Sequence, residues 1–95
     1  MNRPSIQAEV MLGVDTHLDT HVAAVINQGG QLLGTLATPT TAAGYLALLT
    51  WARPFGNLQR AGVEATGTYG AGLARVLRDH AITVLEVNRP DRAKR

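Results

Sequence analysis

The amino-acid sequence predicts an α/β fold built on one mixed, five-stranded β-sheet. Three observations support this prediction. The continuous apolar run Val10–Val14 is typical of a buried strand, two more β-rich segments follow at short spacing, and the second half alternates helical with strand-like patterns. Consecutive strands followed by two helix–strand units fit a sheet with both antiparallel and parallel neighbours.

Length and composition limit the chain to one small domain. The 95 residues are 45% hydrophobic, carry a net charge of +2 and include no cysteine, which excludes a disulfide scaffold and a thiolate zinc site. No apolar run approaches the roughly 18 residues needed to cross a membrane. The polar start Met1–Glu9 differs from a secretory signal, so we expect a cytoplasmic protein with no membrane partner.

The first third of the chain predicts a three-stranded meander. Val10–Val14 forms the first strand, and Asp15 is expected to end it. His21–Asn27 is the second strand, the turn-forming sequence Asn-Gln-Gly-Gly follows, and Gln31–Ala37 returns as the third strand.

A helix is predicted after Pro39 breaks the meander. Thr40 or Thr41 can cap this helix through the side-chain oxygen, and Arg53-Pro54 ends it. Its apolar face consists of four residues at helical spacing, Tyr45, Leu48, Leu49 and Ala52. We expect Tyr45 and Trp51 to be core residues rather than platforms for a nucleobase.

The last third predicts a strand, a second helix and a final strand. The first strand covers Gln59–Glu64 and ends on an acid. The helix covers Thr68–His80, with Tyr69, Leu73, Val76, Leu77 and His80 along one apolar stripe. The final strand covers Ile82–Val87.

The simplest sheet that joins these elements has the strand order 3-2-1-4-5, the ribonuclease H-like arrangement. Right-handed crossovers place both helices on the same face of this sheet. We expect a flexible arm at residues 1–8, a half domain at residues 9–88, and a basic linker at residues 89–95. The opposite face would expose apolar strand surface, so we also expect a homo-oligomer.

Asp15 and Glu64 are the candidate catalytic and metal-binding residues. Each follows an apolar strand, and neighbouring parallel strands lie roughly 4.8 Å apart, so the two carboxylates should converge at one end of the sheet. Adjacent carboxylates repel unless a proton or cation intervenes. Mg²⁺ or Mn²⁺ fits, because hard dications prefer oxygen ligands and retain waters for substrate phosphates.

Structural explanations for these acids stay open at this point. Asp15 could start a turn over Asp15–His17, and Glu64 could favour the N-terminus of the following helix through the helix dipole. The alternating residues Asp15, His17, Asp19 and His21 would resemble a metal cluster on one straight strand. A turn must interrupt that segment, so we expect no such cluster.

Two further segments are candidates for contacts with nucleic acid. Gly67–Gly70 opens the predicted second helix, and its free N–H groups, together with Thr68, could bind a phosphate. Four of the last seven residues are basic, and this tail suits phosphate contacts; they are Arg89, Arg92, Lys94 and Arg95. A solvated terminus is the simpler explanation for the tail.

Three segments together resemble insertion-sequence transposases of the DEDD type, which carry a RuvC-like N-terminal domain. Val14–Ala23 is similar to that family's first motif and Gly62–Tyr69 to its second. Val87–Pro90 resembles the approach to its third motif. The resemblance extends from about Leu12 to the last residue.

The resemblance implies that Asp15 and Glu64 match the first two acids of a tetrad that binds Mg²⁺ or Mn²⁺ for phosphoryl transfer on DNA. It also implies a bacterial, nucleoid-associated protein with DNA as partner, and in some members a guide RNA. The family's remaining two aspartates follow a basic linker like residues 89–95, so we expect an N-terminal fragment that is inactive alone.

Two other functions remain open from the sequence. The same order of elements occurs in actin-like and sugar-kinase nucleotide-binding halves, although their first turn is usually richer in glycine than Thr16-His17-Leu18. A non-catalytic module that binds nucleic acid or protein would use the basic tail and the free sheet face.

Overall fold

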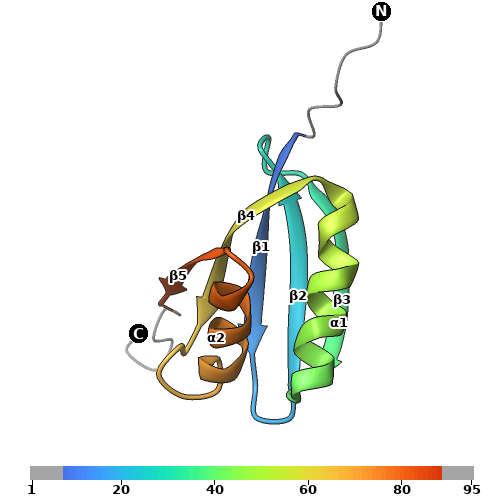
Figure 1. Cartoon of the computed structure of the whole chain (residues 1–95). Helices are drawn as coiled ribbons and strands as arrows, with labels where there is room; N and C mark the ends of the chain where they lie inside the picture. Colours follow the sequence, from blue (N-terminus) through green and yellow to red (C-terminus); the bar gives the residue numbers. More distant parts are fainter. Residues whose placement is uncertain (1–7, 89–95) are drawn as a thin grey trace, which may run out of the picture.

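The computed structural model describes residues 8–88, which form a five-stranded mixed sheet with two helices (Figure 1). The predicted arm and basic linker fall largely or wholly outside these residues. The elements in chain order are β1 (Glu9–Thr16), β2 (Thr20–Asn27), β3 (Leu32–Pro39), α1 (Ala42–Ala52), the 3-10 turn η1 (Arg53–Phe55), β4 (Asn57–Glu64), α2 (Ala71–Asp79) and β5 (Thr83–Val87).

The strand order is β3-β2-β1-β4-β5, as predicted. Strands β1, β2 and β3 pair antiparallel as a meander, whereas β1–β4 and β4–β5 are parallel pairs. The β2–β3 turn forms because the Asn27 carboxamide oxygen accepts hydrogen bonds from the backbone N–H groups of Gly29 and Gln31, at 3.0 and 2.9 Å. Gly30 has φ +83°, a conformation that glycine adopts at low cost.

The prediction that Asp15 ends the first strand is wrong. β1 continues to Thr16, because its antiparallel pairing with β2 extends through Asp15↔Val22 and Thr16↔His21. Its parallel pairing with β4 stops earlier, at Val14↔Val63. Asp15 therefore lies inside a strand and beyond the last residue that β4 pairs with.

Thr41, rather than Thr40, caps α1. The Thr41 hydroxyl oxygen accepts a hydrogen bond from the backbone N–H of Gly44 at 3.0 Å. Thr40 instead donates from its hydroxyl to the Leu18 carbonyl at 3.0 Å, which ties this cap to the β1–β2 turn. A side chain at Gly44 would place its Cβ 2.2 Å from the Pro39 carbonyl oxygen, so only glycine allows the helix to begin so close to β3.

The second helix begins three residues later than predicted, at Ala71. Residues 66–70 form a turn instead, closed by two backbone N–H groups, of Thr68 and Gly70, that donate to the Ala65 carbonyl at 2.9 and 2.8 Å. Ala65 has φ +53°, outside the helical region. The helix stripe therefore loses Tyr69, which is exposed, and keeps Leu73 and Leu77, which are buried.

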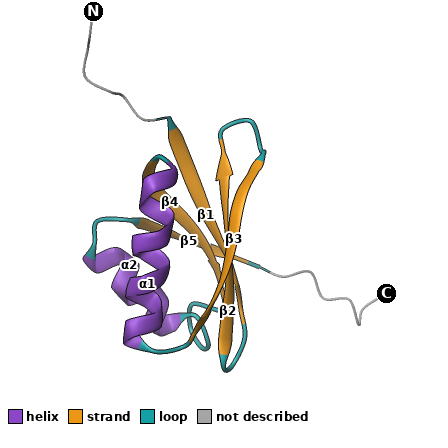
Figure 2. Cartoon of the chain, turned by 90° about the vertical axis from the view of Figure 1, so that its right-hand side faces the viewer, coloured by secondary structure: helices purple, strands orange, loops and turns teal. Residues whose placement is uncertain are grey.

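Both helices cover the same face of the sheet, as predicted from right-handed crossovers (Figure 2). The core lies between the helices and this face and is made of Val10, Leu12, Val14, Ala23, Val25, Leu48, Leu49, Ala52, Ala61, Val63, Leu73, Leu77 and Ile82, with Tyr45 and Trp51 packed against it. In residues 8–88 no helix or strand covers the other face, which we call the open face. No helix in this range is long and apolar enough to cross a membrane.

Candidate active site at the carboxyl ends of β1 and β4

Asp15 and Glu64 occupy adjacent positions on neighbouring parallel strands. The last paired residues of β1 and β4 are Val14 and Val63, and each acid comes next in its chain. Both acids line one open hollow of about 390 Å³ on the open face, together with Met11, Gly13, Val22, Ala24, Ile26, Gly62 and Val87. The fold therefore brings together two acids that are 49 positions apart in the sequence.

Glu64 is held against β1 by Thr16. The backbone N–H of Thr16 donates to the Glu64 carboxylate at 3.4 Å, and the Thr16 hydroxyl donates to the Glu64 carbonyl oxygen at 3.2 Å. The Thr16 side chain is buried on the helix-covered face. Thr16 directly follows Asp15, so these two bonds fix the Glu64 carboxylate beside the backbone of Asp15. The sequence contains no local signal for this role, because the partners are 48 residues apart.

The alternative roles for both acids do not match the structure. The β1–β2 turn is closed by the backbone N–H of His17, which donates to the Thr20 carbonyl at 3.1 Å, so Asp15 precedes that turn. Glu64 cannot stabilise the start of α2, because six residues separate it from Ala71 and the first turn of that helix contains no acid.

The Asp/His row considered as a metal cluster is divided between the two faces. Asp15 and His17 contact each other, with Oδ2 and Nε2 3.4 Å apart. Asp19 lies in the turn, where its carbonyl accepts from the Thr40 N–H at 3.3 Å. His21 lies on the helix-covered face, where it is fully buried and its ring stacks on Tyr45 with centroids 5.7 Å apart.

Burial lowers the pKa of His21 below its ordinary value. The backbone of Thr20 offsets part of this effect, the nearby His17 adds to it, and the backbone of Tyr69 offsets a smaller part. Neither ring nitrogen of His21 has a hydrogen-bond partner among residues 8–88, and the neighbouring Thr38 hydroxyl lacks one as well. The charged form of His21 is therefore disfavoured on the covered face of the sheet, opposite the side that carries Asp15 and Glu64.

A second hollow, of about 410 Å³, opens at the carboxyl end of β4, and we call it the end hollow. It is lined by Thr16, His17, Glu64, Ala65, Thr68, Tyr69, Glu86, Val87 and Asn88. Glu64 lines both this hollow and the one on the open face. Tyr69 is a functional candidate that the apolar spacing of the sequence did not indicate. The pair Gly67 and Gly70 could have indicated it, because two glycines around Tyr69 disfavour a helix at that residue.

At the predicted phosphate site, Gly67–Gly70, two of the four backbone N–H groups are already used within the turn. The Thr68 and Gly70 N–H groups both donate to the Ala65 carbonyl, and the Thr68 hydroxyl points to the same oxygen at 3.5 Å. Thr68 remains exposed at the end hollow, so a contact from its side chain to nucleic acid stays a prediction. The basic residues Arg89, Arg92, Lys94 and Arg95 lie outside the described residues.

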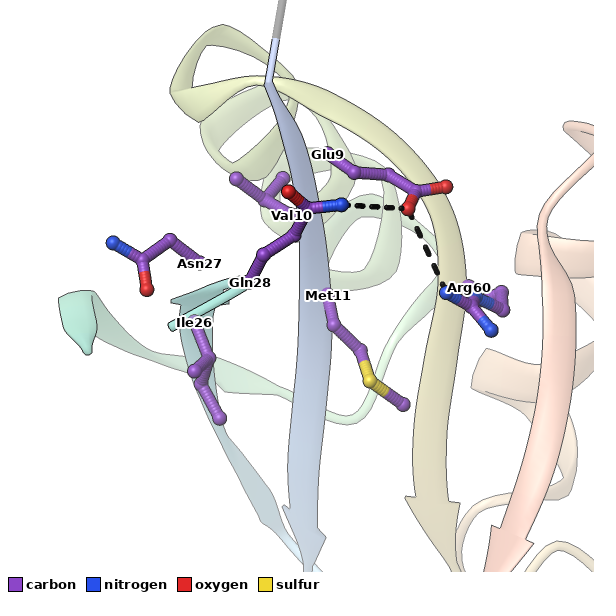
Figure 3. A pocket seen from close by; sticks show the side chains of 7 residues that line it. All are labelled: Glu9, Val10, Met11, Ile26, Asn27, Gln28 and Arg60. Atoms are coloured by element: carbon purple, nitrogen blue, oxygen red, sulfur yellow. Dashed lines mark hydrogen bonds and ion pairs between the residues drawn. The ribbon is translucent and has the colours of Figure 1, made fainter. Parts of the chain in front are cut away.

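A third hollow lies at the opposite end of β1, and a polar network forms part of its lining (Figure 3). The Glu9 carboxylate accepts from the Gln28 carboxamide at 3.4 Å and pairs with Arg60 at 3.6 Å. The two charged side chains of this hollow, Glu9 and Arg60, therefore pair with each other. Glu9 is therefore an acid on the same strand as Asp15 whose charge is paired with Arg60, far from Glu64.

The donor set at Asp15 and Glu64 fits a hard dication. Both side chains offer oxygen ligands from neighbouring strands, which is the chemistry that Mg²⁺ and Mn²⁺ prefer. Within residues 8–88 no group of three or more histidine, cysteine, aspartate or glutamate residues is arranged to hold a metal ion. The described residues thus provide two carboxylates, and a complete coordination shell needs water or further ligands.

Comparison with solved structures supports the fold. The chain is similar to a structure described as the foamy viral protease–reverse transcriptase dRH in complex with double-stranded DNA, with a TM-score of 0.50 and 16% identity. The match covers 88% of this chain and 20% of that chain, so this chain spans about a fifth of its length. Together with the strand order, this likeness shows a ribonuclease H-like fold.

Comparison of sequences supports the family. No curated protein matches the chain. A family model described as a transposase, of the IS110-type DEDD group, matches residues 12–95, which include Asp15, Glu64 and the end hollow. Because the match covers most of the sequence, the chain belongs to the IS110-type DEDD transposase family.

Proposed function

We propose that this chain provides Asp15 and Glu64 as the first two metal-binding carboxylates of a DEDD transposase that acts on DNA during insertion-sequence transposition. The adjacency of the two acids at the ends of β1 and β4 is the observation that carries this proposal. Their position agrees with the rule that α/β sheets bind ligands beyond the carboxyl ends of their strands.

Asp15 and Glu64 would hold Mg²⁺ or Mn²⁺, which supplies Lewis acidity for phosphoryl transfer when bound. Thr16 keeps the Glu64 carboxylate in place through its backbone N–H, and the Thr16 hydroxyl anchors the Glu64 backbone. His17 contacts the Asp15 carboxylate and limits its rotation. These contacts orient two ligands before a cation binds, which lowers the entropic cost of binding.

For the 95-residue chain alone we propose weak binding of one cation without cleavage or joining of DNA. Two carboxylates are a small share of the six oxygen ligands that Mg²⁺ requires. Phosphoryl transfer on DNA is proposed for the whole protein. Robust metal-dependent cleavage by the purified chain, lost in Asp15→Asn, would refute the proposal for the isolated chain.

The metal site can be tested by titrating Mn²⁺ into the chain and following free Mn²⁺ by electron paramagnetic resonance. Asp15→Asn and Glu64→Gln are each expected to weaken binding at least about tenfold, or about 1.4 kcal/mol. Glu9→Gln is the matched control, because Glu9 lies on β1 at the other end and pairs with Arg60. Unchanged binding in both site variants would overturn the proposal.

We also propose that the basic residues after Asn88 bind the DNA backbone, that Thr68 contacts the same nucleic acid, and that a guide RNA binds the same basic residues. Each phosphate neutralised by Arg89, Arg92, Lys94 or Arg95 adds to the salt dependence of binding. Replacing Arg92, Lys94 and Arg95 by glutamine should therefore lower the slope of log affinity against log salt by about 0.9 for each phosphate that is no longer neutralised. An unchanged slope contradicts this assignment.

The open face is proposed to be covered by self-association. Its large side chains remain exposed in the single chain, with exposed fractions of 37% for Met11, 41% for Val22 and 44% for Leu85. Exposed apolar sheet surface of this kind favours association.

A further inference from the structure

Tyr69 is an exposed aromatic residue at the rim of the candidate active site. Its exposed fraction is 52%, and it lines the end hollow together with Glu64. The other large exposed aromatic residue of the described chain, Phe55, packs edge-to-face on Trp51 with ring centroids 5.2 Å apart. No other ring in residues 8–88 contacts that of Tyr69. Its apolar surface is therefore available at the site.

The turn that carries Tyr69 is fixed to Glu64. The Ala65 carbonyl accepts from the N–H groups of Thr68 and Gly70, on either side of Tyr69. A Cβ at Gly70 would lie 2.3 Å from the Glu64 carbonyl oxygen, so glycine allows the turn to press against that residue. The backbone of Tyr69 is thus positioned relative to the carboxylate pair before any ligand binds, which reduces the ordering cost of binding.

The charge of the end hollow favours a neutral ligand group beside Tyr69. Carboxylates of Glu64 and Glu86 line it, and the Glu86 carboxylate accepts a hydrogen bond from the Thr66 hydroxyl. Carboxylates repel a phosphate that has no cation beside it. A nucleobase is neutral and planar, and its N–H groups can donate to a carboxylate such as Glu86. Asn88 adds an amide with donor and acceptor groups.

We propose that Tyr69 is a stacking platform for an unpaired nucleobase of a DNA strand whose backbone approaches Asp15 and Glu64. The base must be unpaired and unstacked, because both faces of a base inside a duplex are already covered by its neighbours. Stacking on an aromatic side chain requires no particular base, since every base has a π-face. The inference deepens the proposed function by naming the state of the DNA at this site.

The test compares three fluorescent ligands of equal length by anisotropy at fixed salt with a chelator present: a single-stranded oligothymidylate, its abasic analogue and a blunt duplex. The abasic strand has the same phosphates and no bases. The chain should bind the single strand about tenfold more tightly than the abasic strand, within the range for stacking on one aromatic residue. Tyr69→Leu should abolish this difference, and Tyr69→Phe should retain it.

Stacking can also be observed directly by fluorescence if the single tryptophan of the chain is moved from position 51 to position 69. In a Trp51→Phe, Tyr69→Trp chain, the single strand should quench tryptophan fluorescence, and the abasic strand should leave it unchanged. Equal affinities for single and abasic strands, or a base preference that survives Tyr69→Leu, overturn the proposal. A matching RNA strand that binds more tightly than the DNA strand would support the stacking site and overturn DNA as its source.

Failure of this inference can be separated from failure of the proposed function. Base-dependent binding is measured without divalent metal, whereas the role of Asp15 and Glu64 is measured by Mn²⁺ titration without nucleic acid. Glu9→Gln, at the other end of β1, should leave both the preference for bases over abasic sites and the binding of Mn²⁺ unchanged. If the unmodified chain shows no base preference but binds Mn²⁺ through Asp15 and Glu64, only the stacking proposal is rejected.

Discussion

The two faces of the sheet use alternate residues of the same strands for different purposes. On β1, Leu12 belongs to the core under the helices and is 0% exposed, whereas its neighbour Met11 lines the open-face hollow and is 37% exposed. Towards the end of the strand, Thr16 is buried on the covered face and Asp15 lines the open-face hollow. The covered face therefore holds the fold together, while the open face presents the acids at a position that the covered face fixes.

The largest expected effect is the loss of a core side chain from the covered face. Leu12→Ala should lower the free energy of unfolding by about 2–5 kcal/mol, because it removes buried surface and leaves a cavity. Met11→Ala on the open face is the matched variant and, at dilutions where the chain is monomeric, should cost less than about 1 kcal/mol, as expected for a partly exposed side chain. Urea denaturation monitored by circular dichroism measures both. Similar losses in the two variants of the monomeric chain would contradict this division between a buried and an exposed face.

The next effect concerns association through the open face. Leu85→Lys should weaken self-association at least about tenfold, or about 1.4 kcal/mol, because it places a charge on the exposed strand β5. Leu46→Lys is the matched control: Leu46 is 46% exposed and belongs to α1, a helix that covers the opposite face of the sheet. Sedimentation equilibrium distinguishes the two. A chain that is monomeric at all concentrations contradicts the proposed oligomer.

A smaller effect is expected from pH on the covered face. The pKa of His21 is lowered in the folded state, so the unfolded chain binds the proton more tightly. Stability should therefore be full above about pH 7.5 and fall as the pH decreases through about 6.5, the ordinary value for histidine. Thermal melting from about pH 7.5 to about 5.5 measures this slope. The His21→Leu chain should lack this contribution, and an unchanged slope would mean that another group causes it.

The smallest effect is a gain in stability on the open face. A Cβ at Gly13 would meet nothing within 4 Å, so Gly13→Ala should raise the free energy of unfolding by about 0.4–1 kcal/mol through reduced entropy of the unfolded chain. Gly62 is paired with Gly13, but its Cβ would lie 2.8 Å from Cγ2 of Val87. Gly62→Ala should therefore gain less or lose stability. A larger gain in Gly62→Ala would contradict the packing described for Val87.

Much of the fold followed from local patterns in the sequence. Alternating and continuous apolar runs predicted all five strands, and the turn at Asn27 and the cap near Thr41 follow from side chains that bond to nearby backbone. The strand order then predicted that Asp15 and Glu64 lie next to each other. The ligand roles of these acids, of Thr68 and of the basic tail stay predictions.

The start of α2 could not be predicted from its apolar spacing. Tyr69, Leu73, Val76 and Leu77 have the period of a helix, and that pattern is compatible with a helix that begins before Tyr69. The left-handed backbone of Ala65 and the close packing of Gly70 against Glu64 favour a turn instead. These are properties of the packed chain, and they move Tyr69 from the core to the rim of the site.

The sequence by itself determined the two-sided character of each strand, because successive side chains of a strand point to opposite faces. It also determined that two acids follow apolar segments. The tertiary structure alone decided that Asp15 lies within a strand and that Thr16 holds Glu64. The physical reason is that these positions depend on strand pairing and on contacts between residues 48 apart, which no local pattern encodes.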